Sequence, residues 1–330
     1  MPATSEITTT VAVCTRDRPE LLERLLHSIA GQSRAPREVL VVDNAPATER
    51  TRDLVREKFP LYRYVREPVP GLDFARNCAL REATGSVLAF IDDDAVADRN
   101  WVEATEQVFG ESPRIAACMG KVDALSLEHE GARLFEANGG FARGSRRIHL
   151  PPGAGLRPPG PSRPLIAWSI SVGSGVSMAI RQGALAELGG FDEALDMGAA
   201  LPGGGDLDIL WRLLEAGHEI VYDPAVAASH EHRRERPAAE MQILEHNRAL
   251  IATLTKLVCT SGWRWKASIL GFLLWRLVKP FKRLLSSLIG RDPLPPALLW
   301  RLALHTWRGL WAYPVARRLS MQRAALYGTK

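Results

Sequence analysis

The first 120 residues alternate short apolar runs with segments whose apolar residues recur at helical spacing. The runs are rich in Val, Ile, Leu and Thr, as buried strands are, and they cover residues 8–15, 39–43, 62–65 and 87–91. Helical spacing or composition marks the segments between them, at residues 19–29, 48–59 and 74–83. This alternation predicts parallel β-α-β units, and therefore an α/β fold with a doubly wound, mostly parallel sheet.

Polar residues follow three of the predicted strands, in the sequences Thr15-Arg16-Asp17, Asp43-Asn44 and Asp92-Asp93-Asp94. Ligands of such sheets bind outside the carboxyl ends of the strands, so we expect these residues to line one crevice. Asp92 and Asp94 alternate along a strand end and share a face, where their oxygens suit Mg²⁺ or Mn²⁺ bridging a diphosphate. An acidic turn after a strand is the plainer alternative.

The pattern changes after residue 120. Residues 139–164 are rich in Gly, Pro and Arg, which predicts a mobile loop over the site. Strands are predicted at residues 171–180 and 218–222, with an amphipathic helix at 206–216 between them. Asp206 begins this helix after three glycines. The helix dipole favours an ionised carboxylate there, which a general base requires, although simple capping of the helix is the alternative.

His230-Glu231-His232 follows the last of these strands and a turn. A histidine can complete a divalent-cation site that carboxylates begin. A histidine in a loop is otherwise usually solvated.

The charge divides the chain near residue 260. The net charge of +5 combines −7 over residues 1–259 with +12 over residues 260–330, which also hold six of the nine tryptophans. The four cysteines lie far apart without metal-site spacing, which fits a reducing compartment. The N-terminus lacks the basic and apolar regions of a secretory signal, so we do not expect one.

Residues 260–330 intersperse apolar clusters with Lys and Arg, which predicts a C-terminal amphipathic helical extension. Pro280 and the prolines at 293–296 are expected to break it into two or more helices, the second from residue 298 to about 319. Its charge-free stretches are far shorter than the roughly 20 residues of a spanning helix. Basic residues with Trp and Leu favour an anionic membrane interface over nucleic acid, and packing on the catalytic domain or a dimer partner is the alternative.

Five segments together carry a resemblance to a known family: TVAVCTRDRPELLERLLHSI, EVLVVDNA, GLDFARNCALREATGSVLAFIDDDA, GGFDEAL and GGGDLDILWRLLEAGHEIVYDPAVAASHEHR. In this order they resemble the inverting family-2 glycosyltransferases, which share the nucleotide-sugar-binding GT-A fold, over about residues 9–246. The resemblance implies a nucleotide-diphosphate-sugar donor of UDP, GDP or dTDP type and a divalent cation, Mn²⁺ or Mg²⁺. It also implies a glycan or lipid-linked acceptor.

The resemblance implies roles for individual residues as well. Asp206 falls at the position of the catalytic base. Metal ligation would come from Asp94 with Asp92 and His230, and His232 is the second choice. Residues matching the donor-binding positions are Thr15, Arg16, Asp43, Arg76, Asn77, Asp92 and Asp93.

The sequence departs from the family pattern at two points. Members usually carry Glu-Asp at the base motif, whereas Gly205 precedes Asp206 here, so whatever the glutamate does is missing or replaced. Asp208 and Glu193 are the next candidates for the base. The Gln-x-x-Arg-Trp motif of processive synthases is absent, which indicates a non-processive enzyme.

We expect a catalytic domain over residues 1–259 and the extension over 260–330. Residues 1 to about 120 would bind the donor and residues 121–259 the acceptor. The protein is expected to be cytoplasmic, peripheral on the inner face of the cell membrane, and active in surface or lipid-linked glycan assembly.

Two other functions remain open. A sugar-nucleotidyltransferase also uses a doubly wound sheet, a metal and aspartates, but CTRDRPELL lacks the glycine of its phosphate loop. A non-catalytic membrane adaptor with a transferase-like fold would explain the altered Gly205-Asp206 motif and the basic C-terminal segment.

Overall fold

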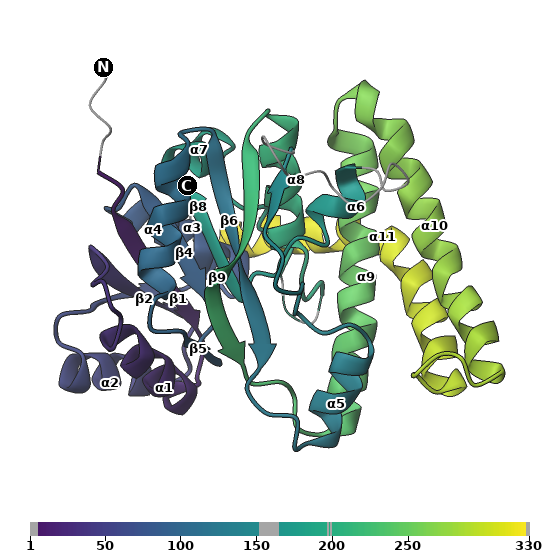
Figure 1. Cartoon of the computed structure of the whole chain (residues 1–330), viewed down its shortest axis with the longest axis horizontal. Helices are drawn as coiled ribbons and strands as arrows, with labels where there is room; N and C mark the ends of the chain where they lie inside the picture. The colour runs from purple at the N-terminus through teal and green to yellow at the C-terminus, as the bar shows by residue number, and fades with distance from the viewer. Residues whose placement is uncertain (1–5, 152–164, 197, 199, 328–330) are drawn as a thin grey trace.

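The computed structural model describes residues 6–151, 165–196, 198 and 200–327. These residues form a nine-stranded mixed sheet in the order β3-β2-β1-β4-β8-β6-β9-β5, with β7 paired to β9 (Figure 1). The strands are β1 Thr9–Thr15, β2 Glu38–Asn44, β3 Arg63–Glu67, β4 Val87–Ile91, β5 Ala95–Ala97, β6 Ile115–Ala124, β7 Ile148–Leu150, β8 Ser177–Arg181 and β9 Glu219–His230. Strands β3, β2, β1 and β4 run parallel, and β8 is antiparallel to both β4 and β6.

Helices cover both faces of the sheet. In chain order they are α1 Pro19–Ala30, α2 Arg50–Lys58, α3 Leu72–Glu82, α4 Trp101–Glu111, α5 Glu130–Ala137, α6 Leu165–Ser169, α7 Gln182–Glu187, α8 Gly205–Glu215, α9 Arg236–Thr260, α10 Trp263–Leu288 and α11 Pro296–Tyr327. The predicted alternation of strands and helices in the N-terminal half is therefore confirmed, as is the α/β fold class.

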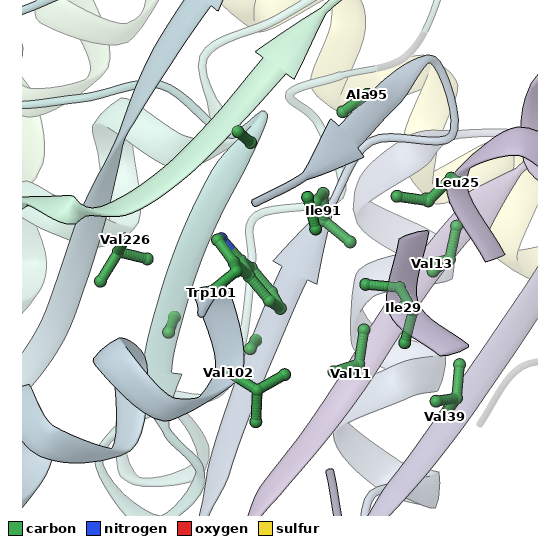
Figure 2. Packing of buried hydrophobic residues seen from close by; sticks show 14 of the residues in the cluster. Val11, Val13, Leu25, Ile29, Val39, Ile91, Ala95, Trp101, Val102 and Val226 are labelled. Carbon is green, nitrogen blue, oxygen red and sulfur yellow. The ribbon is translucent and has the colours of Figure 1, made fainter. Parts of the chain in front are cut away.

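Successive residues of the central strands point to opposite faces, which explains why their sequences are apolar throughout. Val11, Val13 and Val39 pack on one face against Leu25 of α1 and Trp101 of α4, as Figure 2 shows. The intervening residues of the same strands pack on the other face against α3, α7 and α8.

Helices α9, α10 and α11 form a further helical layer beside the sheet (Figure 1). Ile269, Leu273 and Leu277 of α10 are buried against α9. Helix α11 crosses α9 so closely at Gly309 that a Cβ there would lie 2.6 Å from the Cβ of Ile251. The far end of α11 reaches the N-terminal half of the chain, where Arg323 donates a hydrogen bond to the Pro70 carbonyl. Much of the C-terminal segment therefore packs on the rest of the protein.

The prolines of the C-terminal segment have different effects. Those at 293–296 separate α10 from α11, as predicted, but α10 continues through Pro280, so the predicted break there is wrong. A proline removes one helical hydrogen bond, and the buried face of α10 outweighs this loss. Helix α11 is also longer than predicted and includes Pro314. None of the helices in the described ranges has an apolar stretch long enough to cross a bilayer.

Two predicted strands have different bounds in the structure. The strand predicted at 171–180 begins only at Ser177, because Ser171–Val176 form the loop that enters the site. The strand predicted at 218–222 continues past Pro224 to His230, so this histidine ends a strand and does not follow a turn. Of the predicted 139–164 loop, residues 148–150 form β7, and residues 152–164 lie outside the described residues.

Candidate active site

The candidate site lies at the carboxyl ends of β1, β2 and β4, which are neighbours in the sheet. Thr15 at the end of β1 is in register with Asp43 at the end of β2, and both are buried. Asp92, Asp93 and Asp94 follow β4 directly. The structure thus brings together the strand ends that the sequence places in one crevice.

Asp92, Asp94 and His230 form the centre of the site. Each offers one oxygen or nitrogen atom, and these atoms lie within 4.8 Å of one another. The short strand β5 follows the aspartates and pairs antiparallel with the end of β9, which sets Ala95 opposite His230. His230 Nε2 consequently lies 3.1 Å from Asp94 Oδ1.

The charges of this cluster suit a bound cation. Burial raises the pKa of Asp92, and the neighbouring Asp94 carboxylate raises it further. Asp94 is buried too, but His230 and Arg18 outweigh the burial and hold its pKa at about 2. A divalent cation would relieve the repulsion between the two carboxylates, and oxygen ligands with an imidazole nitrogen fit Mn²⁺ or Mg²⁺.

Asp93 is fully buried beside this cluster and ties it to the start of α1. Thr15 Oγ1 donates a hydrogen bond of 2.6 Å to Asp93 Oδ2, and Arg18 Nη2 lies 2.8 Å from Oδ1. Arg18 Nη1 also donates to Asp94 at 3.1 Å. Burial raises the pKa of Asp93 to about 7 against the opposing charge of Arg18.

The structure places Arg16 outside this network. Its side chain is 55% exposed and forms an ion pair with Asp17 at 3.9 Å. Asp17 has a φ of 53°, a left-handed conformation that changes the direction of the chain before α1. Arg18, and not Arg16, consequently reaches the aspartates.

Asp43 is fully buried, and only one of its two carboxylate oxygens accepts a hydrogen bond from a described residue. Its Oδ2 accepts a hydrogen bond of 2.9 Å from Tyr64 Oη, whereas its Oδ1 has no hydrogen-bond partner among the described residues. Burial raises the pKa of Asp43 to about 6. A buried acceptor without a donor carries a free-energy cost, which an N–H group of a bound ligand would relieve.

Arg76 links the aspartate cluster to the start of α8. This buried side chain donates a 2.9 Å hydrogen bond from Nη1 to Asp73 Oδ1, and Nη1 lies 3.5 Å from Asp196. Burial alone would lower the pKa of Arg76, but the carboxylates of Asp196, Asp73, Asp206 and Asp92 raise it well above its usual value. The Arg76 guanidinium therefore offsets the negative charge of Asp92, which follows β4, and of Asp206, at the start of α8.

Asp206 is held in place by two backbone N–H groups. Gly175 N donates to Oδ2 and Leu207 N to Oδ1, each at 2.8 Å. The next residue of the same loop, Val176, accepts a hydrogen bond from the backbone N–H of Asp92. The candidate base and the candidate metal cluster are thus fixed to successive residues of one loop.

Asp73 explains the missing glutamate of the base motif. A Cβ on Gly205 would lie 2.0 Å from Asp73 Oδ2, so the buried Asp73 carboxylate occupies the space that a side chain at position 205 needs. The backbone N–H of Gly205 donates to Asp196 at 2.7 Å. Asp73 and Asp196 thus place two carboxyl groups immediately beside residue 205.

Asn77 and Asp208 have partners that suit a structural role. The Asn77 amide accepts from the Phe191 N–H and donates to the Phe191 carbonyl and to Glu193, so it fixes the loop at residues 190–193. Asp208 is fully buried between Lys256 and Arg212. The alternatives Asp208 and Glu193 thus contact the side chains of Lys256, Arg212 and Asn77, whereas Asp206 contacts backbone N–H groups.

His232 contacts the side of the His230 ring that carries Nδ1. The Nδ1 atoms of the two histidines lie 3.0 Å apart, and His232 Nε2 lies 2.8 Å from Glu136 Oε1. Burial lowers the pKa of His232. The structure therefore favours His230 over His232 as the residue beside the aspartates.

Two solved structures that are similar to this chain share its fold. A mannosyltransferase from Pyrobaculum calidifontis, PcManGT, in complex with GDP-Man and Mn²⁺ superposes with a TM-score of 0.57 at 21% identity, covering 99% of this chain and 89% of its own. GalNAc-T7 with UDP, GalNAc and Mn²⁺ gives a TM-score of 0.50 at 16% identity, covering 76% and 51%. The fold is the GT-A fold of nucleotide-sugar transferases.

Sequence comparison agrees with this class. Residues 10–151 match the model of Glycosyl transferase family 2. The pre-mycofactocin glycosyltransferase of Mycobacterium tuberculosis is 26% identical over 225 residues, which are 68% of this chain and 43% of that protein. The succinoglycan biosynthesis protein ExoM of Rhizobium meliloti is 38% identical over 98 residues, 28% of this chain and 31% of that protein. This chain thus spans less than half the length of these relatives.

Over residues 10–151 the chain is similar to glycosyl transferase family 2. Asp92, Asp94 and His230 lie together in the structure as the sequence predicts. Arg18, Asp73 and Asp196 are additional site residues that the sequence analysis does not single out. Each depends on a backbone turn or a tertiary contact that has no local sequence signal.

Proposed function

We propose that this chain is an inverting glycosyltransferase that moves a sugar from a nucleotide-diphosphate sugar to an acceptor hydroxyl. The observation that carries the proposal is the joint placement of two sets of side chains. Asp92, Asp94 and His230 lie within 4.8 Å of one another, and Asp206 is anchored to the same loop as Asp92. This pairs a cation site for the diphosphate with a carboxylate that can take a proton.

The metal cluster would act on the donor, and Asp206 would act on the acceptor. Asp92, Asp94 and His230 would hold Mn²⁺ or Mg²⁺, which stabilises the charge of the leaving diphosphate when bound. Asp206 removes the proton of the acceptor hydroxyl, because a neutral hydroxyl is a poor nucleophile. A single displacement from the face opposite the leaving group inverts the anomeric centre.

The donor nucleotide would lie across the ends of β1 and β2. The free Oδ1 of buried Asp43 suits an N–H of the nucleobase, and Thr15 fixes the neighbouring Asp93. Arg76 supplies positive charge beside the diphosphate. The similar solved structures hold GDP-Man with Mn²⁺ and UDP with GalNAc and Mn²⁺, which supports this class of donor and cation.

A donor panel tests the proposed reaction. The full chain is incubated with UDP-, GDP- and dTDP-sugars and Mn²⁺, and the released nucleotide is identified. Release of a nucleoside diphosphate is expected from one donor, whereas pyrophosphate release would indicate a sugar-nucleotidyltransferase. No turnover of any donor, with or without acceptors, would favour a non-catalytic adaptor.

We further propose that the enzyme is peripheral on the cytoplasmic face of the membrane, in surface or lipid-linked glycan assembly. Helix α11 exposes an apolar stripe at helical spacing, made up of Trp300, Leu304, Trp307, Trp311 and Val315. Its basic residues and tryptophans suit an anionic interface, where each Lys or Arg contributes about 1 kcal/mol.

Flotation with liposomes tests this attachment. The triple substitution of Trp300, Trp307 and Trp311 by serine should reduce flotation with anionic liposomes, while Leu61→Ser, at a side chain that is 92% exposed in the donor half, should not. The membrane proposal would be contradicted if the native protein, the triple tryptophan variant and Leu61→Ser float equally. It would also be contradicted if flotation does not depend on lipid charge and salt, and α11 would then have a packing role alone.

A further inference from the structure

A cavity of about 1150 Å³ is lined in part by Leu207, the residue after the candidate base Asp206. Helices α9 and α10 form two of its walls, and residues 138–143 and α6 contribute to the others. Asp206 is close enough to contribute to the pKa of Arg143 and of His246, both of which line the cavity.

The cavity is strongly basic. Arg143, Arg276, Lys279 and Arg283 all line it, and the described lining residues include neither Asp nor Glu. Arg283 forms an ion pair of 2.7 Å with Asp292, which fixes its position. Burial, with the charge of Arg283 as a second cause, lowers the pKa of Arg276 to about 10. Several cations gathered in one cavity favour an anionic ligand.

Two guanidinium groups in the cavity have buried N–H donors without partners. The Nε atoms of Arg143 and Arg276 are buried and lack a hydrogen-bond acceptor among the described residues. Other nitrogens of the same groups are engaged: Arg276 Nη2 donates to Asn247 Oδ1 at 2.8 Å, and Arg143 Nη1 donates to the Gly140 carbonyl at 3.0 Å. Each arginine is therefore held in position by hydrogen bonding through another nitrogen, while its Nε–H group has no acceptor in the described part of the chain. An N–H group of this kind suits a phosphate oxygen.

Aromatic side chains lie beside these cations. Phe272 and Trp275 of α10 line the cavity and stack with ring centroids 5.5 Å apart. Trp275 is also 46% exposed, and the adjacent Leu274 is 54% exposed. The cavity thus combines a basic interior with an apolar, accessible part of α10.

We propose that this cavity binds the phosphate or diphosphate group of the acceptor, with Arg143 and Arg276 as its hydrogen-bond donors. This inference rests on the proposed glycosyltransferase function and names the chemical class of its acceptor. The anion anchors the acceptor so that its hydroxyl reaches Asp206, next to Leu207 in the cavity wall. An apolar chain attached to the phosphate would follow Phe272 and Trp275 along α10.

Calorimetry with defined probes tests the proposal on the full chain. The probes are decyl diphosphate, inorganic pyrophosphate and uncharged decyl maltoside. Decyl diphosphate should bind, and Arg143→Gln and Arg276→Gln should each weaken it about 10- to 100-fold, as expected for the loss of a charge-assisted hydrogen bond. Arg276→Lys should retain part of the affinity. Arg308→Gln, the same charge change at an exposed position of α11, is the control and should bind as the native protein does.

The soluble probe separates two sources of the anion. Tighter binding of decyl diphosphate than of pyrophosphate assigns a lipid-linked acceptor, and equal binding assigns a soluble sugar phosphate. The proposal is overturned if decyl maltoside binds as well as decyl diphosphate, or if correctly folded Arg143→Gln and Arg276→Gln proteins keep native affinity. UDP and GDP binding with Mn²⁺ is measured in the same variants, so failure of this proposal is distinguishable from failure of the donor site.

Discussion

Replacing Gly205 with alanine tests whether Asp73 occupies the space that the family's glutamate would need. The new Cβ would lie 2.0 Å from Asp73 Oδ2, which is far inside van der Waals contact. Asp73 is fully buried, and its other oxygen accepts a hydrogen bond from Arg76 at 2.9 Å. The carboxylate must therefore move, and movement disturbs its hydrogen bond to Arg76.

The expected loss of stability follows from these contacts. Overpacking a buried position typically costs about 1–3 kcal/mol, and disturbing a hydrogen bond between charged groups costs a similar amount. We expect Gly205→Ala to lower the free energy of unfolding by about 2–3 kcal/mol. In an Asp73→Ala background the clash is absent, and the same substitution should be neutral or gain up to about 1 kcal/mol, because alanine is the better helix former.

Urea denaturation of the four proteins in this double-mutant cycle gives the coupling free energy directly. We expect the two substitutions to be coupled by about 2 kcal/mol or more, with the double variant more stable than the sum of the single effects implies. Additive effects would refute the reasoning, since Asp73 would then not be the group that excludes a side chain at position 205.

Three further predictions follow from the structure. Asp206→Asn should keep native donor affinity but lose about 10²- to 10⁴-fold in turnover with acceptor, and near-native turnover would place the base elsewhere. Asp43 has a pKa of about 6 when folded, above its unfolded value of about 3.9, so its ionisation destabilises the fold as pH rises from 4 to 6. Asp43→Asn should therefore gain up to about 3 kcal/mol at pH 7 over the native protein, a gain that disappears below pH 4, and a constant difference in pH-dependent urea denaturation would contradict this. Gly309→Ala should destabilise the protein by about 1–3 kcal/mol, because a Cβ there meets Ile251 of α9. Gly271→Ala, at a helical glycine whose Cβ position has no atom within 4 Å apart from the neighbouring residues and backbone of its own helix, should be neutral or stabilising in the same thermal-unfolding assay.

The N-terminal fold was predictable because β1, β2 and β4 are buried on both faces. Their uninterrupted apolar runs and the helical spacing between them leave few other arrangements. The same reasoning brought Asp92 and Asp94 to the sheet edge. His230 was placed with them through a family resemblance, and the structure supplies the physical reason, which is the pairing of β5 with β9.

The remaining site residues depend on tertiary contacts that a sequence pattern does not encode. Arg18 reaches the aspartates because Asp17 adopts a φ of 53°, and nothing in the order Arg16-Asp17-Arg18 distinguishes the two arginines. Asp73 becomes a site residue because Gly205 lies against it. The continuity of α10 through Pro280 likewise depends on packing against α9, which local propensity does not reveal.

The proposed metal site is tested by donor binding to Asp94→Ala in the presence and absence of Mn²⁺. Calorimetry should show that the native protein and the exposed control Asp53→Ala bind the nucleotide sugar in a Mn²⁺-dependent manner that EDTA abolishes, whereas Asp94→Ala does not bind it. His230→Ala should weaken Mn²⁺ affinity more mildly, by about 10-fold or more. Undiminished affinity of Asp94→Ala for the nucleotide sugar, or of the native protein in EDTA, would contradict the assignment of Asp92, Asp94 and His230 as a metal site for the donor diphosphate.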